Sequence, residues 1–351
     1  WTDALAVRAV TWLSKRVGRA ILKLTQSDYQ EHHLGPLVAK FGTPGAVNGF
    51  VFNYLGAKIR GRSKLPTGER VICFSPHPDD DVISMGSILH KLVENGNEIV
   101  VAYMTSGNIA VFDHDVRRYV DFLERLCAEG ALDSAHVGPL AAKVRRFLDE
   151  KAPGQVDIPE IQDIKRIIRE SEAVAGIEVM GLTRSNARFL NLPFYQTGKV
   201  RKDPVGPADV AIVRDLLLEV RPTLVFVAGD LSDPHGTHRM CKEAIELALD
   251  EVAPAGGGGQ LERPEVWLYR GAWQEWPVTE ATWLVPMSQE ELRLKIQAIF
   301  KHQSQKDSAP FPGQDDREFW QRAEARNTDT AAELDALGLA EYFAMEAYVV
   351  Q

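Results

Sequence analysis

The chain has 351 residues, of which 45% are hydrophobic and 25% charged, a composition typical of a soluble globular protein. Its net charge of −9 and its short cationic runs argue against a nucleic-acid partner. No apolar run reaches the roughly 18 residues of a membrane span, and no signal peptide is recognisable at the N-terminus. The three cysteines Cys73, Cys127 and Cys241 are best explained as reduced thiols, so we expect a cytoplasmic protein.

The first part of the chain is predicted to be helical. Residues 1–60 repeat apolar side chains at three- and four-residue spacing, and the polar stretch RGRSKLPTGER then predicts a linker. We therefore expect an N-terminal helical extension over 1–64 and a second domain over 65–351. Because residue 1 is Trp and not Met, we also expect the chain to be a piece of a longer protein.

From residue 71 onward, short apolar runs alternate with amphipathic segments. This pattern predicts βαβ units and an α/β fold in which helices flank a mainly parallel sheet. The expected strands are 71–75, 98–104, 187–191, 223–228 and 265–270. The expected helices are 82–95, 115–129, 138–149, 159–179, 208–220, 238–251 and 289–302.

Two loops at the ends of predicted strands are rich in metal-ligating side chains. SPHPDDD follows the first strand and AGDLSDPHGTHRM follows the fourth. Taken singly, each is explained better by a turn and a helix cap. Ligands of open α/β sheets bind beyond the carboxyl ends of the strands, so the two loops together favour a functional site. The residues expected to converge there are His77, Asp79, Asp80, His235 and His238.

The residue types in these loops suit a catalytic zinc ion. Two imidazoles and one carboxylate provide three ligands and leave a fourth position for water. Zinc lowers the pKa of its water from 15.7 toward about 7, and a carboxylate outside the ligand set takes the proton. The neighbouring Asp79 and Asp80 can divide these two roles. The glycine-rich phosphate loops and the GxSxG, HExxH and paired CxxC motifs are missing from the sequence.

The motifs resemble those of the LmbE-like, or PIG-L, N-deacetylases. PHPDDD resembles their (P/A)HPDD(E/D) motif, and HGTH with Arg239 resembles their second motif, usually HPDH. IRESEAVAGIEVMGL is similar to their RxxE helix, and its Arg169 and Glu172, one helical turn apart, are interpreted as a structural ion pair. ARFLNLPFY and KIQAIFKHQSQ are similar to two further segments of the family. The resemblance covers roughly residues 70–310.

The resemblance implies a Rossmann-like domain and a zinc-dependent hydrolase. The reaction implied is removal of the N-acetyl group from an N-acetylglucosamine-type substrate, which releases acetate and a primary amine. Zinc is the implied cofactor, with another divalent metal as the alternative, and a small N-acetylated amino sugar is the implied partner. The residues carried over are His77, Asp80 and His238 as metal ligands, Asp79 as general base and His235 as the group that stabilises the oxyanion.

Two positions depart from the family pattern. Thr237 stands where the second motif usually has an acidic residue, so a hydrogen bond from that carboxylate to His235 is lost or replaced. Phe194 and Tyr195 stand where an LPDG loop is usual, which removes an acidic contact to the sugar. Two alternatives therefore stay open: an amidase for a different N-acyl or thiol-conjugate amide, and a catalytically altered sugar-sensing domain.

One subgroup of the family is more similar still. PHPDDDVISMG, AYMTSGNIAV and DPHGTH are similar to the subgroup fused behind a glucosamine-6-phosphate deaminase domain of the isomerase type. The opening WTDALAVRAVTWLSKRVGRAILKLT resembles the segment that links the two domains. A fused deaminase domain and a second copy of the chain in a homo-oligomer are the two macromolecular partners left open.

Overall fold

A seven-stranded mixed sheet forms the centre of the computed structural model, which describes residues 1–198, 201–229, 236–271, 274–305 and 317–351. The strand order is β3-β2-β1-β4-β5-β7-β6. β1 to β5 are parallel, and β7 runs antiparallel to both β5 and β6. The strands are β1 Arg70–Ser75, β2 Glu98–Tyr103, β3 Ala187–Phe189, β4 Leu224–Ala228, β5 Glu265–Tyr269, β6 Trp283–Met287 and β7 Ala344–Val350.

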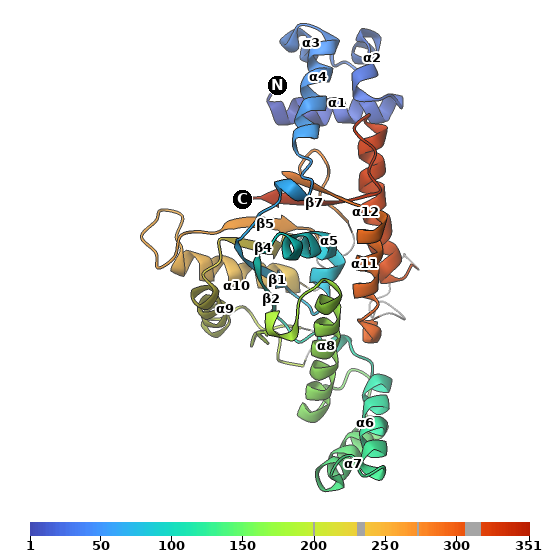
Figure 1. Cartoon of the computed structure of the whole chain (residues 1–351), viewed down its shortest axis with the longest axis vertical. Helices are drawn as coiled ribbons and strands as arrows, with labels where there is room; N and C mark the ends of the chain where they lie inside the picture. The colour runs from blue at the N-terminus through green and yellow to red at the C-terminus, as the bar shows by residue number, and fades with distance from the viewer. Residues whose placement is uncertain (199–200, 230–235, 272–273, 306–316) are drawn as a thin grey trace.

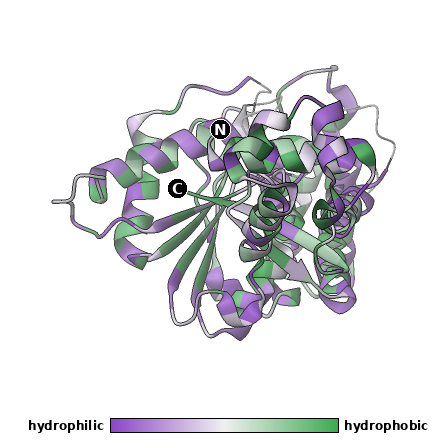
Figure 2. Cartoon of the chain, turned by 90° about the horizontal axis from the view of Figure 1, so that it is seen from above, coloured by the Kyte–Doolittle hydropathy of each residue, from purple (hydrophilic) through white to green (hydrophobic). Residues whose placement is uncertain are grey.

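Helices cover both faces of this sheet. α9 and α10 pack against one face in a core with Ile72 and Phe74, whereas α5, α8, α11 and α12 share the opposite core with Val71 and Cys73. β1 is buried on both faces, which explains its continuous apolar run. Figure 2 shows the hydrophobic residues gathered in the strands. The helices are α5 Asp80–Glu94, α6 Asp113–Ala128, α7 Ser134–Glu150, α8 Pro159–Val179, α9 Pro207–Val220, α10 Thr237–Val252, α11 Gln289–Ile299 and α12 Phe319–Ala336.

The N-terminal helices lie at one end of the molecule, and α6 and α7 lie at the other (Figure 1). The N-terminal helices share one apolar core with β6, β7 and α12. Val10, Val51, Leu284 and Leu334 belong to this core. Thr2 caps the N-terminus of α1, because its hydroxyl accepts the Leu5 N–H at 3.3 Å. These helices are α1 Asp3–Val17, α2 Gln26–Glu31, α3 Gly35–Phe41 and α4 Pro44–Ala57.

The α/β prediction is confirmed, since each expected strand and helix is present with bounds shifted by a few residues. α5 begins at Asp80, two residues before the predicted start, so the acidic turn forms the first turn of the helix. β6, β7 and α12 were not predicted. Among the described residues, no helix combines the length and apolar character needed to span a membrane.

Candidate metal and catalytic site

The turn after β1 directs three consecutive carboxylates in different directions. The hydroxyl of Ser75, the last residue of the strand, donates to the carbonyl of His77 at 2.6 Å and accepts the N–H of Asp81 at 3.1 Å. The N–H of Asp79 donates to the same His77 carbonyl at 2.8 Å. These bonds close a tight turn, residues 76–79, that joins the strand to the helix. Each aspartate side chain then has its own partners.

Asp80 lies between two imidazoles. Its Oδ2 is 3.0 Å from Nδ1 of His77 and 3.1 Å from Nε2 of His238, and it also accepts the backbone N–H of His77 at 2.9 Å. One ligand atom from each of these three side chains lies within 4.8 Å of the others. A tetrahedral zinc ion with ligands about 2.0–2.1 Å away would hold them about 3.3 Å apart, so the trio needs only small shifts to coordinate one.

The electrostatics of the trio favour an ionised carboxylate. Burial would raise the pKa of Asp80, but the charge and hydrogen bond of His238 and those of His77 outweigh it and hold that pKa well below its usual range. Asp80 and His238 are buried, whereas about a quarter of the His77 side chain is exposed. The trio therefore has one side open toward solvent.

The position of His238 follows from the sheet order. β4 pairs with β1 in parallel, with Val71 opposite Leu224, so the segments after both strands leave the same edge of the sheet. Gly236, with φ +70°, precedes α10 in a left-handed conformation that favours glycine. The structure thus brings His238 to the acidic turn. His235 lies outside the described residues, and Thr237 is buried in the first turn of α10.

Asp79 is held by an arginine and does not cap its helix. Its Oδ2 accepts a hydrogen bond from Nη2 of Arg169 on α8 at 2.9 Å, and its side chain makes no capping bond to α5. The predicted pair between Arg169 and Glu172 is the weaker contact, with Nη1 and Oε2 4.0 Å apart. Glu172 instead accepts the N–H and the hydroxyl of Ser304, both at 2.7 Å. The sequence carried no sign that Arg169 reaches a residue 90 positions away.

A glycine makes room for this arginine. Gly107, in the TSGN segment after β2, has φ +61°, and a Cβ there would lie 3.0 Å from Nε of Arg169 and 2.9 Å from Cδ of Pro78. In the same segment the Thr105 hydroxyl donates to the carbonyl of Pro76 at 2.7 Å. The segment after β2 thus contacts both the acidic turn and the guanidinium group that bonds Asp79.

Asp81 faces the sheet. Its carboxylate accepts the Tyr103 hydroxyl at 2.9 Å and the Ser75 hydroxyl at 3.2 Å, and the residue is fully buried. Burial raises the pKa of Asp81 to about 7, a shift that the Tyr103 hydrogen bond opposes and the charge of Asp79 reinforces. This third aspartate therefore anchors the turn to β2.

The LPFY segment contributes packing at the site. Phe194 is buried in the core of α9 and α10, so the residue that replaces the usual aspartate does not reach a substrate position. The ring of Tyr195 meets the imidazole of His77 edge to face with centroids 6.3 Å apart, and Nζ of Lys202 lies 4.4 Å from the Tyr195 ring centre. Tyr195 beside the trio was not predicted as a site residue.

Comparison with known families now adds to this geometry. The family model described as PIG-L, GlcNAc-PI de-N-acetylase, matches residues 72–249, about half of the chain. The match takes in the acidic turn, Arg169 and the start of α10 with His238. The chain belongs to the PIG-L family. The resemblance seen in the sequence motifs is thereby confirmed.

Individual relatives of this PIG-L chain differ in how much they cover. A putative glucosamine-6-phosphate deaminase-like protein of Bacteroides thetaiotaomicron is 46% identical over 365 residues, which take in 99% of this chain and 55% of that protein. The chain thus spans about half the length of this relative. A diacetylchitobiose deacetylase of Thermococcus kodakarensis is 30% identical over 100 residues, 28% of this chain and 35% of that protein.

The solved structures offer more distant likenesses. An N,N'-diacetylchitobiose deacetylase from Pyrococcus horikoshii matches with a TM-score of 0.46 and 19% identity, over 81% of this chain and 84% of that one. A likeness of this degree carries no conclusion about substrate or mechanism.

Proposed function

We propose that this PIG-L chain is a metal-dependent N-deacetylase that hydrolyses the acetamide of an N-acetylglucosamine-type sugar to acetate and a primary amine. The observation that carries the proposal is that a set of possible metal ligands and a separate carboxylate lie side by side at the acidic turn. His77, Asp80 and His238 form a ligand trio, and Asp79 beside them is held by Arg169 outside it. The family description and the name of the Thermococcus relative both support an N-acetylated amino sugar as the substrate class.

The trio fits a divalent metal, zinc above all. Two imidazole nitrogens and one carboxylate oxygen are the donors that zinc prefers, and three protein ligands are the usual set at a catalytic zinc. His77, Asp80 and His238 would hold the ion. When bound, such an ion supplies a Lewis acid for the carbonyl and lowers the pKa of water at the open position.

The chain's own residues supply the remaining chemistry. Asp79 accepts the proton of the attacking water, and Arg169 holds one oxygen of its carboxylate by a hydrogen bond. His235 is proposed to stabilise the developing oxyanion, which the sequence motif alone supports. The proton taken up by the site then passes to the leaving amine. The open side of His77 leaves room for the sugar to approach from solvent.

The proposal extends to the organisation of the longer protein. The Bacteroides relative is much longer than this chain and has a deaminase-like name, which supports the fused deaminase domain expected from the sequence. In this proposal residues 1–64 form the helical connection and residues 65–351 the deacetylase domain. A substrate that contains glucosamine would suit both activities.

The test combines metal analysis with a screen for acetate release. The purified chain is expected to bind about one zinc ion. It should release acetate from N-acetylglucosamine, its 6-phosphate or a diphospho-linked form, and a chelator should abolish this release. A thiol-conjugate amide in the same panel separates the other amidase from the deacetylase. Acetate release that persists undiminished in a protein stripped of metal contradicts the proposal. Metal and sugar binding without turnover of any amide favours the sensing domain.

A further inference from the structure

A small pocket lies beside Asp79. Apolar side chains from α5, α11 and α12 make most of its wall, and its polar lining comes from Asp79, His302 and Gln305. The centre of a water molecule can occupy a volume of about 20 Å³ inside this pocket. A cavity needs roughly 10–15 Å³ by the same measure to hold a water, so this one is large enough, and three polar side chains border it.

His302 is the least explained polar residue in this region. Only 3% of it is exposed, and neither ring nitrogen has a hydrogen-bond partner within the described residues. Burial lowers the pKa of His302 to about 4, so near neutral pH the ring carries one N–H donor and one acceptor. Leaving such groups unpaired costs about 1–3 kcal/mol each, which an apolar residue of similar size would avoid.

The fold nevertheless makes room for this imidazole. Gly176 of α8 faces it, and a Cβ at that position would lie 2.9 Å from Nε2 of His302. The neighbouring residues are tied in place, because Ser304 donates to Glu172 and the Gln305 amide donates to the carbonyl of Ala110 at 3.3 Å. The ring is thus fixed by its surroundings, while its two nitrogens keep their hydrogen-bonding capacity for something else.

Asp79 needs a second point of attachment. Arg169 bonds only its Oδ2, and a carboxylate held at one oxygen can still turn about its side-chain torsions. A base must present a defined lone pair to the attacking water, and a misplacement of about 1 Å can lower a rate about a hundredfold. Arg169 itself also has spare donors, since its Nε and Nη1 have no hydrogen-bond partner within the described residues.

We propose that the pocket binds one water molecule that accepts a hydrogen bond from His302 and donates one to the Asp79 carboxylate, which makes His302 a positioning residue for Asp79. This inference rests on the proposed function, because it gives Asp79 the role of general base. The water and Arg169 then hold the carboxylate from two directions. The water would pair one of the two ring nitrogens of His302 and would explain why polar side chains border the pocket next to the base.

A crystal structure of the zinc-loaded chain tests the water directly. We expect density for one ordered water within hydrogen-bond distance of both His302 and the Asp79 carboxylate. A pocket that is empty, or a water that contacts only one of the two side chains, overturns the proposal. This readout does not depend on turnover, so it decides the inference even if the chain releases no acetate and the proposed function fails.

Two variants test the positioning role. His302→Phe keeps the ring but cannot bond the water, so we expect kcat to fall about tenfold to a hundredfold with unchanged KM and zinc content. His302→Gln keeps a donor and an acceptor and is expected to restore most of that loss. An unchanged kcat in a folded His302→Phe protein overturns the role, as does a loss that His302→Gln fails to repair. If His302→Phe does not fold, His302→Leu takes its place: kcat should be about tenfold to a hundredfold higher in His302→Gln than in His302→Leu, and equal values overturn the role.

Discussion

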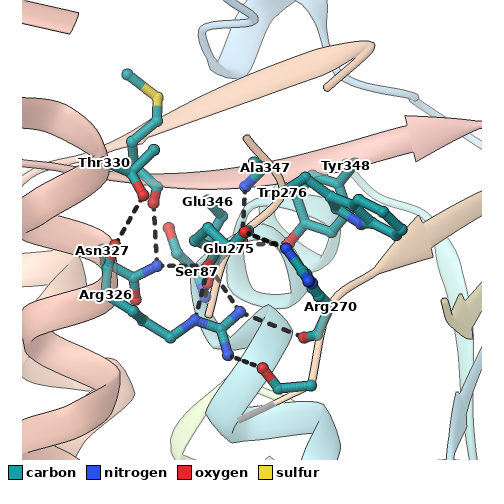
Figure 3. A network of polar contacts seen from close by, with 12 residues as sticks. Ser87, Arg270, Glu275, Trp276, Arg326, Asn327, Thr330, Glu346, Ala347 and Tyr348 are labelled. Carbon is teal, nitrogen blue, oxygen red and sulfur yellow. Dashed lines mark hydrogen bonds and ion pairs between the residues drawn. The ribbon is translucent and has the colours of Figure 1, made fainter. Parts of the chain in front are cut away.

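Two clusters of buried charge lie close to α5, and they differ in how completely their polar atoms are paired. One is the site cluster of Asp79, Asp80, His238 and Arg169 at the start of the helix. The other is a network that joins the middle of α5 to α11, α12 and β7, and Figure 3 shows its part around Glu275, Asn327 and Glu346. Both bury carboxylates and cations among apolar side chains, so burial alone does not tell them apart.

The network closes on itself. The ammonium of Lys295 donates to Asn327 and Glu346, both at 2.8 Å, and the Glu346 carboxylate also accepts the N–H groups of Ser87 and Ile88. Lys295 and Glu346 are completely inaccessible to solvent. Gly86 allows the close approach, since a Cβ there would lie 2.9 Å from Cγ of Lys295.

The second half of the network is equally saturated. Glu275 accepts three hydrogen bonds at one oxygen, from Nε and Nη2 of Arg326 and from the Asn327 amide, and its other oxygen accepts the N–H of Ala347 at 3.2 Å. Nη1 of Arg326 donates to the carbonyl of Gly271 at 2.6 Å. In the described residues, no buried side-chain polar atom of this network lacks a hydrogen-bond partner.

The site cluster, by contrast, keeps unused capacity. Within the described residues, two nitrogens of the buried Arg169 have no hydrogen-bond partner, and neither has either ring nitrogen of His302, which borders the pocket beside Asp79. Buried polar groups that are fully hydrogen-bonded hold neighbouring elements in place. Buried polar groups without partners cost free energy, which a bound ligand or water can offset. The comparison therefore supports the proposal that the carboxyl edge of β1 is the functional site and that the Lys295 network is its structural support.

Removal of a ligand should have the largest effect. His238→Ala leaves two of the three donors, so we expect metal content to fall from about one ion per chain to nearly none and acetate release to become undetectable. Elemental analysis and an acetate assay measure both. His114→Ala, at an exposed histidine of α6, is the matched control and should keep metal and activity. Full metal content in His238→Ala would remove this residue from the ligand set.

Asp79→Asn should separate the base from the ligands. The amide can still contact Arg169 but cannot take a proton, so we expect acetate release to fall about 10²- to 10⁴-fold while zinc content stays unchanged. The control is Asp163→Asn on α8, where the carboxylate is largely exposed. Parallel loss of metal in Asp79→Asn would place this carboxylate among the ligands and contradict the division of roles.

Lys295→Met tests the supporting network. Removal of the ammonium leaves Glu346 buried without its counter-charge, so we expect the free energy of unfolding to fall by about 3–5 kcal/mol. Chemical denaturation measures this loss. Lys15→Met, which breaks an exposed pair with Glu333, should change it by less than about 1 kcal/mol. Where Lys295→Met stays folded, its zinc content should match that of the unaltered chain, because the network supplies no ligand.

The sequence predicted the site cluster better than its support. The alternation of apolar runs and helices located β1 and β4, and the motifs named the residues that those strands bring together. Arg169 was assigned to Glu172 because that partner is local, while its bond to Asp79 depends on how α8 packs. The network was missed for the same reason.

β7 shows why the remainder of the fold was harder to predict. Its sequence AMEAYVV places Glu346 inside a buried strand, where a carboxylate weakens the apolar signal. Tertiary contacts with Lys295 and with the N–H groups of Ser87 and Ile88 make that position favourable, and nothing in the local sequence reveals them. β6 contains Pro286 and lies at the edge of the sheet, where β7 is its neighbouring strand, so its local pattern is weak as well.

The smallest expected effect concerns stability in acid. Burial lowers the pKa of His302 to about 4 from the 6.5 of an unperturbed histidine, so between these values the unfolded chain binds the proton that the folded chain excludes. Through this difference in pKa, His302 does not reduce the free energy of unfolding above about pH 6.5. As pH falls from 6.5 toward 4, protonation of the unfolded chain lowers that free energy by about 3 kcal/mol in total. His302→Asn removes the titrating ring, so its unfolding free energy should fall less steeply over this range. Denaturation of the metal-free proteins at pH 7, 5.5 and 4 measures the difference, and identical slopes for both would mean that the folded chain protonates His302 as readily as the unfolded one.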